Sequence, residues 1–161
     1  MTAQNVHVVL GALVAVGCRA WVSGGWGVDA LVGYQTRPHR DLDLAIDASD
    51  EPTALKALAR LGLRIETDWR PVRVELACAE VGWVDVRPVV FDENGEGRQA
   101  DVDGGFFVYP QGCFTSGWIA GARVGCISVE QQVRFHSGYE LRDVDRGDLV
   151  LLRQLGSDAI P

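Results

Sequence analysis

The stretch that decides the fold is Val22–Asp47, which reads VSGGWGVDALVGYQTRPHRDLDLAID. Near its end, Asp41 and Asp43 alternate with Leu42 and Leu44, which is the pattern of a β-strand with one buried face. A strand that buries the two leucines points both carboxylates to its other face. The sequence therefore predicts a strand over residues 42–46 with two acids side by side on its polar face.

These acids and the glycines upstream of them point to a shared ligand. Two neighbouring carboxylates repel each other unless a cation lies between them. A hard divalent cation, Mg²⁺ before others, binds one or two carboxylates and completes its shell with phosphate oxygens. Gly24 and Gly25 form a turn just upstream, whose backbone N–H groups suit those phosphates. The residues predict a metal ion together with a triphosphate.

A third acid lies in the apolar segment 83–90, WVDVRPVV, whose single carboxylate is Asp85. Alternation places Val84 and Val86 on one face of this strand, and Asp85 with Arg87 on the other. On its own, Asp85 would more often be a strand-edge acid or an ion-pair partner of Arg87. If this strand lies beside 42–46, Asp85 completes a site of three carboxylates, and the glycine turn favours that interpretation.

The aspartate pair also has other interpretations. A solvated strand face is the default for any D-x-D. A calcium loop fails, because Ala45 offers no side-chain oxygen at the fifth position and Ile46 stands where the sharp-turn glycine belongs. The D-x-D of nucleotide-sugar transferases stays open on the motif alone, although it leaves the glycine turn unexplained.

The remaining segments predict an α+β fold, with a small mixed β-sheet and helices packed mainly on one side. Periodicity, caps and turn residues predict helices over 6–16, 26–32, 51–61, 129–135 and 145–155. Strands are predicted over 20–23, 42–46, 63–67, 72–77, 83–90 and 106–109, with a hairpin over 117–126 that turns near Gly121. The segments 34–40 and 92–105 are predicted to be surface loops. We expect a single domain over 1–161, closed by the C-terminal helices from about residue 128.

Composition limits the function classes. The chain has 161 residues, 47% of them hydrophobic, and a net charge of -7. This acidity argues against nonspecific nucleic-acid binding and mildly favours a cationic small molecule. The four cysteines form no C-x-x-C pair, which indicates reduced thiols rather than zinc ligands. The apolar run 8–17 is too short for a membrane span and no basic segment precedes it, so we expect a cytoplasmic protein.

The same residues resemble a known family. An ordered set of residues resembles the polymerase-β-type nucleotidyltransferases, and most closely the lincosamide and aminoglycoside 2''-nucleotidyltransferase group. The set is Gly24-Gly25-Trp26, Asp29, Thr36-Arg37-x-His39-x-Asp41-x-Asp43 and Val84-Asp85. The gap between the glycines and the aspartates is a few residues longer than in the broad superfamily, and the antibiotic-modifying group shares that longer loop. A softer resemblance over 127–149 extends to the closing helices of the group.

The resemblance implies an adenylyltransferase. Such an enzyme moves a nucleoside monophosphate, here AMP, from a Mg²⁺-bound nucleoside triphosphate such as ATP to a hydroxyl of a small cationic acceptor. An aminoglycoside or lincosamide antibiotic is the implied acceptor. Asp41 and Asp43 would hold Mg²⁺, while Asp85 would share a metal and act as general base. Ser23 and the backbone of Gly24 and Gly25 would hold the β and γ phosphates.

Four further residues carry weaker expectations. Arg37 is an equally good candidate for a phosphate partner and for an ordinary loop arginine. His39 is expected to position the loop, because magnesium prefers oxygen ligands. Asp29 is expected to cap a backbone turn or to line the site. Trp26 is expected in the core or in a pocket wall.

Two rival functions stay open at this stage. One is a minimal nucleotidyltransferase that modifies a protein partner, as in toxin–antitoxin pairs. The other is a catalytically silent nucleotide-binding module, against which the third carboxylate argues. The apolar C-terminal segments, including Trp118 and the helices around Phe135 and Leu151, predict a homodimer.

Overall fold

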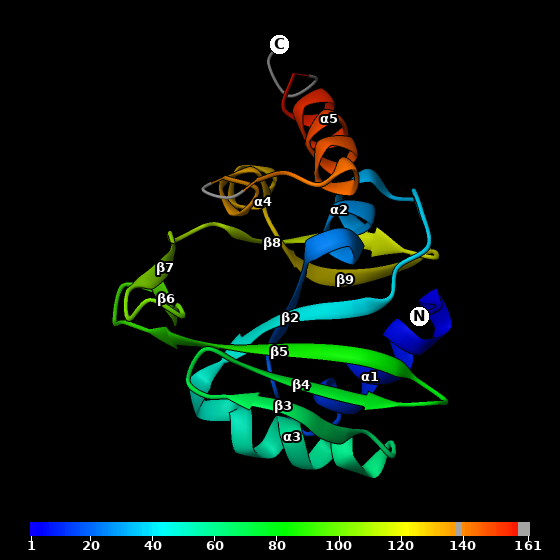
Figure 1. The fold of residues 1–161 in the computed structure, drawn as a ribbon, viewed down its shortest axis with the longest axis vertical. Helices are drawn as coiled ribbons and strands as arrows, with labels where there is room; N and C mark the ends of the chain where they lie inside the picture. Colours follow the sequence, from blue (N-terminus) through cyan, green and yellow to red (C-terminus); the bar gives the residue numbers. More distant parts are fainter. Residues whose placement is uncertain (138–139, 158–161) are drawn as a thin grey trace.

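The computed structural model describes residues 1–137 and 140–157. In this part of the chain, nine strands form a mixed sheet whose main path runs β3-β4-β5-β2-β1-β9-β8, with β6 and β7 extending from β5 (Figure 1). The strands are β1 (Ala20–Ser23), β2 (Asp41–Asp47), β3 (Arg64–Trp69), β4 (Arg73–Cys78), β5 (Gly82–Phe91), β6 (Gly97–Ala100), β7 (Phe106–Tyr109), β8 (Phe114–Ile119) and β9 (Ala122–Ile127). The helices are α1 (Ala3–Val14), α2 (Gly24–Val32), α3 (Glu51–Arg60), α4 (Val129–Phe135) and α5 (Asp143–Ser157), with a 3-10 turn at Ala48–Asp50.

The pairing around the central strand β2 sets the geometry of the sheet. β2 runs antiparallel to β1 and parallel to β5, and β5 pairs antiparallel with β4. At the other side, β1 pairs parallel with β9, which forms the predicted hairpin with β8 and turns at residues 120–121. The expectation that the strand of Asp85 lies beside that of the aspartate pair is confirmed.

The apolar face of the central strands carries the main core. Leu42, Leu44, Val84 and Val86 are fully buried and belong to one cluster with side chains from α1, α2 and α3. Burial of this face at roughly 25 cal/mol per Å² of apolar surface is the main stabilising term for such a layer. The predicted α+β class, with helices mainly on one side, is confirmed.

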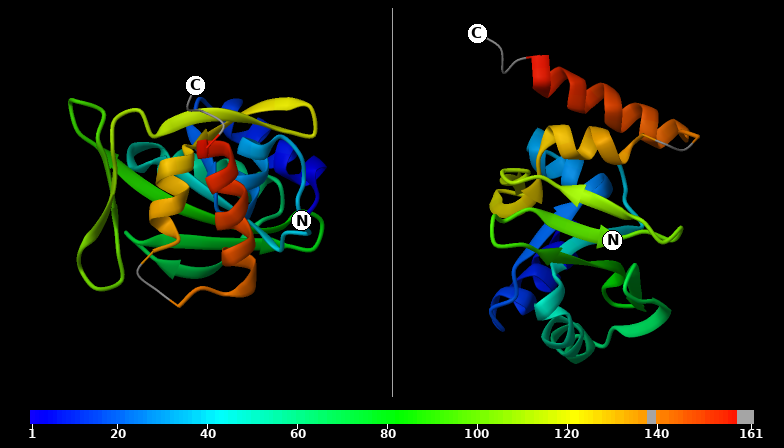
Figure 2. Two further views of the ribbon diagram at one scale, coloured as in Figure 1. Left: turned by 90° about the horizontal axis from the view of Figure 1, so that it is seen from above. Right: turned by 90° about the vertical axis from the view of Figure 1, so that its left-hand side faces the viewer.

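The C-terminal helices lie at one end of the molecule, as both sets of views show (Figures 1 and 2). α4 packs against α5, and both contact α2. α3 lies at the opposite end (Figure 1) and contacts α1. No helix in residues 1–137 and 140–157 combines the length and the apolar character that a membrane crossing needs.

One predicted boundary was wrong, and one strand was missed. The second helix starts at Gly24, two residues earlier than predicted, so the glycine pair forms its first turn. The segment 92–105, predicted to be a loop, contains strand β6, which pairs with β5 and β7. Aspartate-centred turns flank this short strand, and Asp92 Oδ1 accepts from the backbone N–H groups of Asn94 and Glu96. The turn residues outnumber the strand residues, which hides the strand in the sequence.

A close approach between β8 and α2 gives a stability prediction. A Cβ atom at Gly117 would overlap the carbonyl oxygen of Ala30, which is backbone and cannot rotate away. We expect Gly117→Ala to destabilise the protein by about 1–3 kcal/mol, the usual effect of overpacking. The matched control is Gly11→Ala within α1, where a Cβ has open space, and this change should stabilise by about 0.5–1 kcal/mol. Urea denaturation of both variants measures the difference, and equal stabilities would contradict the close packing.

Candidate active site

A row of polar side chains crosses the face of the sheet opposite the main core. Ser23 on β1 is the register partner of Asp43 on β2, which is the register partner of Asp85 on β5. Asp85 in turn partners Glu75 on β4. Because register partners project to the same side of a sheet, these four side chains lie next to one another.

Asp41 lies on the same face, two residues before Asp43 on β2. Its side chain is 40% exposed and faces the Arg40 guanidinium at 3.4 Å, whereas the side chain of Asp43 is 21% exposed. Side-chain exposure therefore decreases along β2, from Asp41 at the open edge of the site to Asp43 at its centre.

Asp85 is the most enclosed of the three predicted acids, with a side chain 5% exposed. Its Oδ2 accepts hydrogen bonds from Arg87 at 2.8 Å and from Arg73 at 3.0 Å. Its Oδ1 is buried and has no hydrogen-bond partner among the described residues. The ion pair with Arg87, which is the alternative to a catalytic role for Asp85, therefore exists, but it uses only one carboxylate oxygen. Buried polar atoms are normally satisfied, so an unpartnered oxygen in this row is suited to a ligand.

Asp43 is held by the same arginine, whose Nη2 donates to Asp43 Oδ1 at 3.0 Å. Burial raises the pKa of Asp43 above its ordinary value, the Arg87 guanidinium opposes that effect, and the carboxylates of Asp85 and Asp41 add to it. The pKa of Arg87 is raised, because its attraction to Asp43 and Asp85 outweighs burial. The centre of the row is thus an acidic pair bridged by one cation.

The chemistry of these donors fits a hard divalent cation. Carboxylate oxygens are the ligands that Mg²⁺ prefers, and Asp85 Oδ1 is free to take such a role. In residues 1–137 and 140–157, no three carboxylate, imidazole or thiol groups already converge closely enough to hold a metal ion. Arg87 instead lies between Asp43 and Asp85. A metal ion at this pair would therefore compete with the guanidinium for the negative charge of the same two carboxylates.

The glycine pair meets the row at Ser23. Gly24 has φ +58°, and a Cβ there would overlap Asp43 Oδ2, so only glycine fits between the helix start and the carboxylate. Ser23 is the N-cap of α2 but makes no side-chain capping bond, which leaves its hydroxyl available. Free backbone N–H groups at a helix N-terminus attract phosphate groups. On the far side of the turn, the side-chain amide of Gln132 donates to the Gly24 carbonyl at 3.3 Å.

A buried network fixes the loop between α2 and β2. His39 Nε2 lies 2.5 Å from Asp29 Oδ2, while the backbone N–H and the hydroxyl of Thr36 donate to Asp29 Oδ1. Asp29 thus caps the turn, and His39 positions the loop, as expected. Trp26 is buried with its ring 4.7 Å from that of His39, which confirms its predicted place in the core.

Arg37 is engaged differently from its expected role as a phosphate partner. Its Nε and Nη2 donate to the two oxygens of Asp148 on α5, at 3.3 and 2.8 Å. Its other terminal nitrogen lies 3.1 Å from His39 Nδ1. The guanidinium also packs against Gly25, where an added Cβ would lie 2.8 Å from it. The geometry makes Arg37 a clamp between α5 and the glycine turn, and direct contact with a phosphate stays a prediction.

The contact between His136 and Asp148 predicts a pH dependence of stability. The Asp148 carboxylate, 3.9 Å from His136 Nε2, raises the pKa of His136 despite burial. Burial would raise the pKa of Asp148, but hydrogen bonding from His136 and Arg37 outweighs it, and the pKa is lowered. A raised folded-state histidine pKa gives stability that is complete below about pH 6.5 and is lost as pH rises through the folded value.

We therefore expect the melting temperature of the wild type to fall, relative to that of His136→Gln, as pH rises from about 6 to about 8.5, by an amount on the order of 2 °C. His7→Gln is the matched control and should retain the full pH dependence. Thermal melts in a pH series measure both variants. An unchanged pH dependence in His136→Gln would remove the His136–Asp148 pair from the account.

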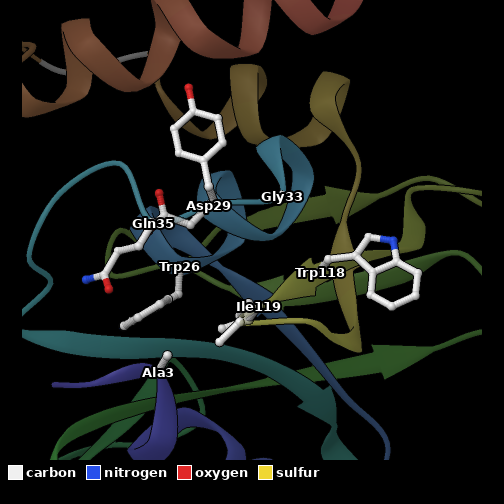
Figure 3. A pocket seen from close by; sticks show the side chains of 9 residues that line it. Ala3, Trp26, Asp29, Gly33, Gln35, Trp118 and Ile119 are labelled. Atoms are coloured by element: carbon white, nitrogen blue, oxygen red, sulfur yellow. The ribbon is translucent and has the colours of Figure 1, made fainter.

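A separate pocket of about 270 Å³ lies between α1, α2 and the β8–β9 hairpin. It is lined by Trp26 and Asp29 of α2, Gln35 of the following loop, and Trp118 and Ile119 of β8 (Figure 3). None of the three predicted acids lines this pocket. Trp26 therefore lines a pocket that is separate from the predicted acids, which lie on the polar face of the sheet.

Three residues of the candidate site and its surrounding network were not predicted from the sequence. Arg73 and Glu75 alternate with Val74 and Leu76 in the same way that the acids of β2 and β5 alternate with their apolar neighbours. That alternation was the available signal for placing them on the carboxylate face. Asp148 offered no such signal, because its partner Arg37 lies 111 positions away in the chain.

A mixed sheet that carries neighbouring aspartates beside a helix opened by two glycines is the arrangement of a nucleotidyltransferase. Comparisons with known proteins give the particular family. The family model for aminoglycoside-2''-adenylyltransferase matches residues 5–152. The chain belongs to this family.

Individual relatives agree with the assignment. A lincosamide resistance protein from Staphylococcus haemolyticus is 34% identical over 155 residues, covering 96% of each chain. The lincomycin-bound crystal structure of the lincosamide antibiotic adenylyltransferase LnuA superposes with a TM-score of 0.87 at 34% identity, covering 96% of this chain and 98% of that one. The solution structure of the antibiotic-resistance factor ANT(2'')-Ia shares the fold, with a TM-score of 0.78 at 21% identity over 97% of this chain and 85% of that one.

Proposed function

We propose that this protein transfers AMP from Mg²⁺-bound ATP to a hydroxyl group of an aminoglycoside or lincosamide antibiotic. The single observation that carries the proposal is the register of Asp43 with Asp85 directly beside the N-terminus of α2. Two carboxylates, one with an unpartnered oxygen, lie next to a helix N-terminus, and backbone N–H groups at such a terminus attract phosphate groups. Family membership supports adenylyl transfer as the reaction.

The proposed reaction assigns one task to each part of the row. The backbone of Gly24 and Gly25 and the Ser23 hydroxyl bind the β and γ phosphates. Asp85 accepts the proton of the attacking hydroxyl, and the new bond joins the acceptor oxygen to the α-phosphorus. The bond between that phosphorus and the bridging oxygen breaks, and pyrophosphate leaves. Mg²⁺, held by Asp41, Asp43 and Asp85, would neutralise the triphosphate and the leaving pyrophosphate.

Lincosamides are the first acceptors to test, because the relatives at 34% identity are a lincosamide resistance protein and a lincosamide antibiotic adenylyltransferase. The acidic face supports a cationic acceptor of either class. Asp41 is exposed at its edge, and Glu75 lies next to Asp85 in the row. Carboxylates at such positions attract the amines that both antibiotic classes carry.

The test is incubation with MgATP and a panel of lincosamides and aminoglycosides, followed by pyrophosphate release and mass spectrometry of each acceptor. We expect pyrophosphate release that depends on one acceptor class, together with an acceptor heavier by one AMP unit. A heavier protein and unmodified antibiotics would instead support a nucleotidyltransferase that acts on proteins. Nucleotide binding without pyrophosphate release would support a silent nucleotide-binding module.

We further infer a single domain over 1–161 that acts as a cytoplasmic homodimer. Exposed apolar side chains at Trp118 on β8 and at Val144 and Val150 on α5 support an interface between two copies. Light scattering at micromolar concentration measures the mass, and a monomeric value would contradict the dimer.

A further inference from the structure

Arg87 occupies the position between the two central acids of the row. Its Nη2 lies 3.0 Å from Asp43 Oδ1 and 2.8 Å from Asp85 Oδ2. Its register partner on β2 is Ala45, whose small side chain leaves room on this face for the arginine to reach back along the strands. One guanidinium nitrogen thus bridges the two carboxylates that the proposed function assigns to a metal ion.

The attachment of Arg87 differs from that of a purely structural arginine. Its Nε is buried and has no hydrogen-bond partner among the described residues. Arg37, by contrast, binds Asp148 in a two-point fork through Nε and Nη2. Two-point forks fix an arginine geometrically, whereas a bridge through one nitrogen leaves the group free to exchange partners. Arg87 is also 32% exposed, so it has an open side toward which it can move.

The Arg87 bridge and a metal ion are alternative ways to neutralise the carboxylates of Asp43 and Asp85. Asp43 and Asp85 repel each other and need a cation between them. Arg87 supplies that charge through the same carboxylates that a divalent cation would use. A second arginine, Arg73, lies 3.0 Å from Asp85 Oδ2 and would keep that oxygen partnered without Arg87, while the unpartnered Oδ1 is open to a metal.

We propose that Arg87 is an exchangeable placeholder for the metal ion. Without a metal it bridges Asp43 and Asp85, and a divalent cation displaces it toward the phosphates of the bound nucleotide. This inference rests on the proposed function, in which the protein binds a metal ion and a triphosphate. Metal binding alone is then weakened by competition from the guanidinium. When a triphosphate is present, the displaced guanidinium gains an anionic partner, so metal and nucleotide bind cooperatively.

The test measures Mn²⁺ binding by electron paramagnetic resonance of the free ion, with and without a non-hydrolysable ATP analogue and with no antibiotic. Arg87→Met should bind Mn²⁺ alone at least about tenfold more tightly than the wild type, since the competing cation is gone. In Arg87→Met, the gain in Mn²⁺ affinity that the ATP analogue produces should be smaller than in the wild type by a similar factor. Arg87→Gln repeats the test with a polar side chain, in case the methionine variant fails to fold.

Arg40→Met is the matched control. It removes the same charge from between Asp41 Oδ2, 3.4 Å away, and Glu75 Oε1, 3.6 Å away, whereas the Asp43–Asp85 pair is bridged by Arg87. We expect less than about a threefold gain in Mn²⁺ affinity, as for a surface charge. Equal gains in the Arg40 and Arg87 variants, or no gain in the Arg87 variants, would overturn the placeholder while leaving the proposed function intact. Absence of Mn²⁺ binding to the wild type with the analogue would overturn both.

Discussion

Replacing Asp85 by Asn should lower turnover by at least about 100-fold, the usual contribution of a general base. The variant should still fold and still bind MgATP, although less tightly if Asp85 also touches the metal. Asparagine keeps an oxygen that can accept from Arg73 and Arg87, so the hydrogen bonds now made by Oδ2 have a replacement acceptor. What it loses is the charge and the basicity of the carboxylate.

The pH profile distinguishes a base from a structural residue. A carboxylate must be ionised to accept the hydroxyl proton, so the wild type should show an acidic limb that Asp85→Asn lacks. The control is Asp47→Asn, because Asp47 lies on the same face of β2 but pairs with Arg19 outside the row. That variant should retain its turnover and its acidic limb. An Asp85→Asn enzyme with most of its turnover would remove Asp85 from the mechanism.

Replacing Asp43 by Asn should weaken the metal-dependent binding of triphosphate by at least about tenfold. Asp43 sits at the centre of the row, between Ser23 and Asp85, and Gly24 packs directly over its Oδ2. Without its charge, no metal joins the protein to the phosphates at this point. Asp41→Asn should have the same effect to a smaller degree, because its side chain is more exposed.

Calorimetric titration with MgATP measures this effect. We expect the affinity of Asp43→Asn to fall by at least about tenfold, which corresponds to about 1.4 kcal/mol. The affinity of Asp47→Asn should match the wild type. Removal of divalent cations with a chelator should bring the wild type down to the level of Asp43→Asn. Unchanged affinity in both Asp41→Asn and Asp43→Asn would show that this pair is not the metal site.

The sequence predicted the centre of the site because its signals are local and repeated. Alternation fixed the faces of β2 and β5 independently, and the parallel pairing of the two strands then brought Asp43 and Asp85 into register. The glycine pair was also placed correctly beside the acids. Its incorporation into α2 was missed, because glycine is a poor helix former and Gly24 adopts a left-handed conformation.

The parts that could not be predicted depend on contacts between distant segments. Nothing in the spacing of Arg37 points to Asp148, so the arginine was considered for phosphate binding rather than as a clamp to α5. The sequence indicates Arg87 only as a partner for Asp85, because its second contact, with Asp43, depends on the pairing of the two strands. Strand β6 was missed because its partners, rather than its own residues, define it.

The most direct test of the central claim follows one phosphorus atom. The protein is incubated with Mg²⁺, a lincosamide and ATP labelled at either its α-phosphate or its γ-phosphate, and the antibiotic is then isolated. The account predicts that the α-label moves to the antibiotic while the γ-label leaves in pyrophosphate, and that Asp85→Asn transfers neither at a comparable rate. Transfer of the γ-label to the antibiotic, or transfer of neither label to any lincosamide or aminoglycoside, would contradict it.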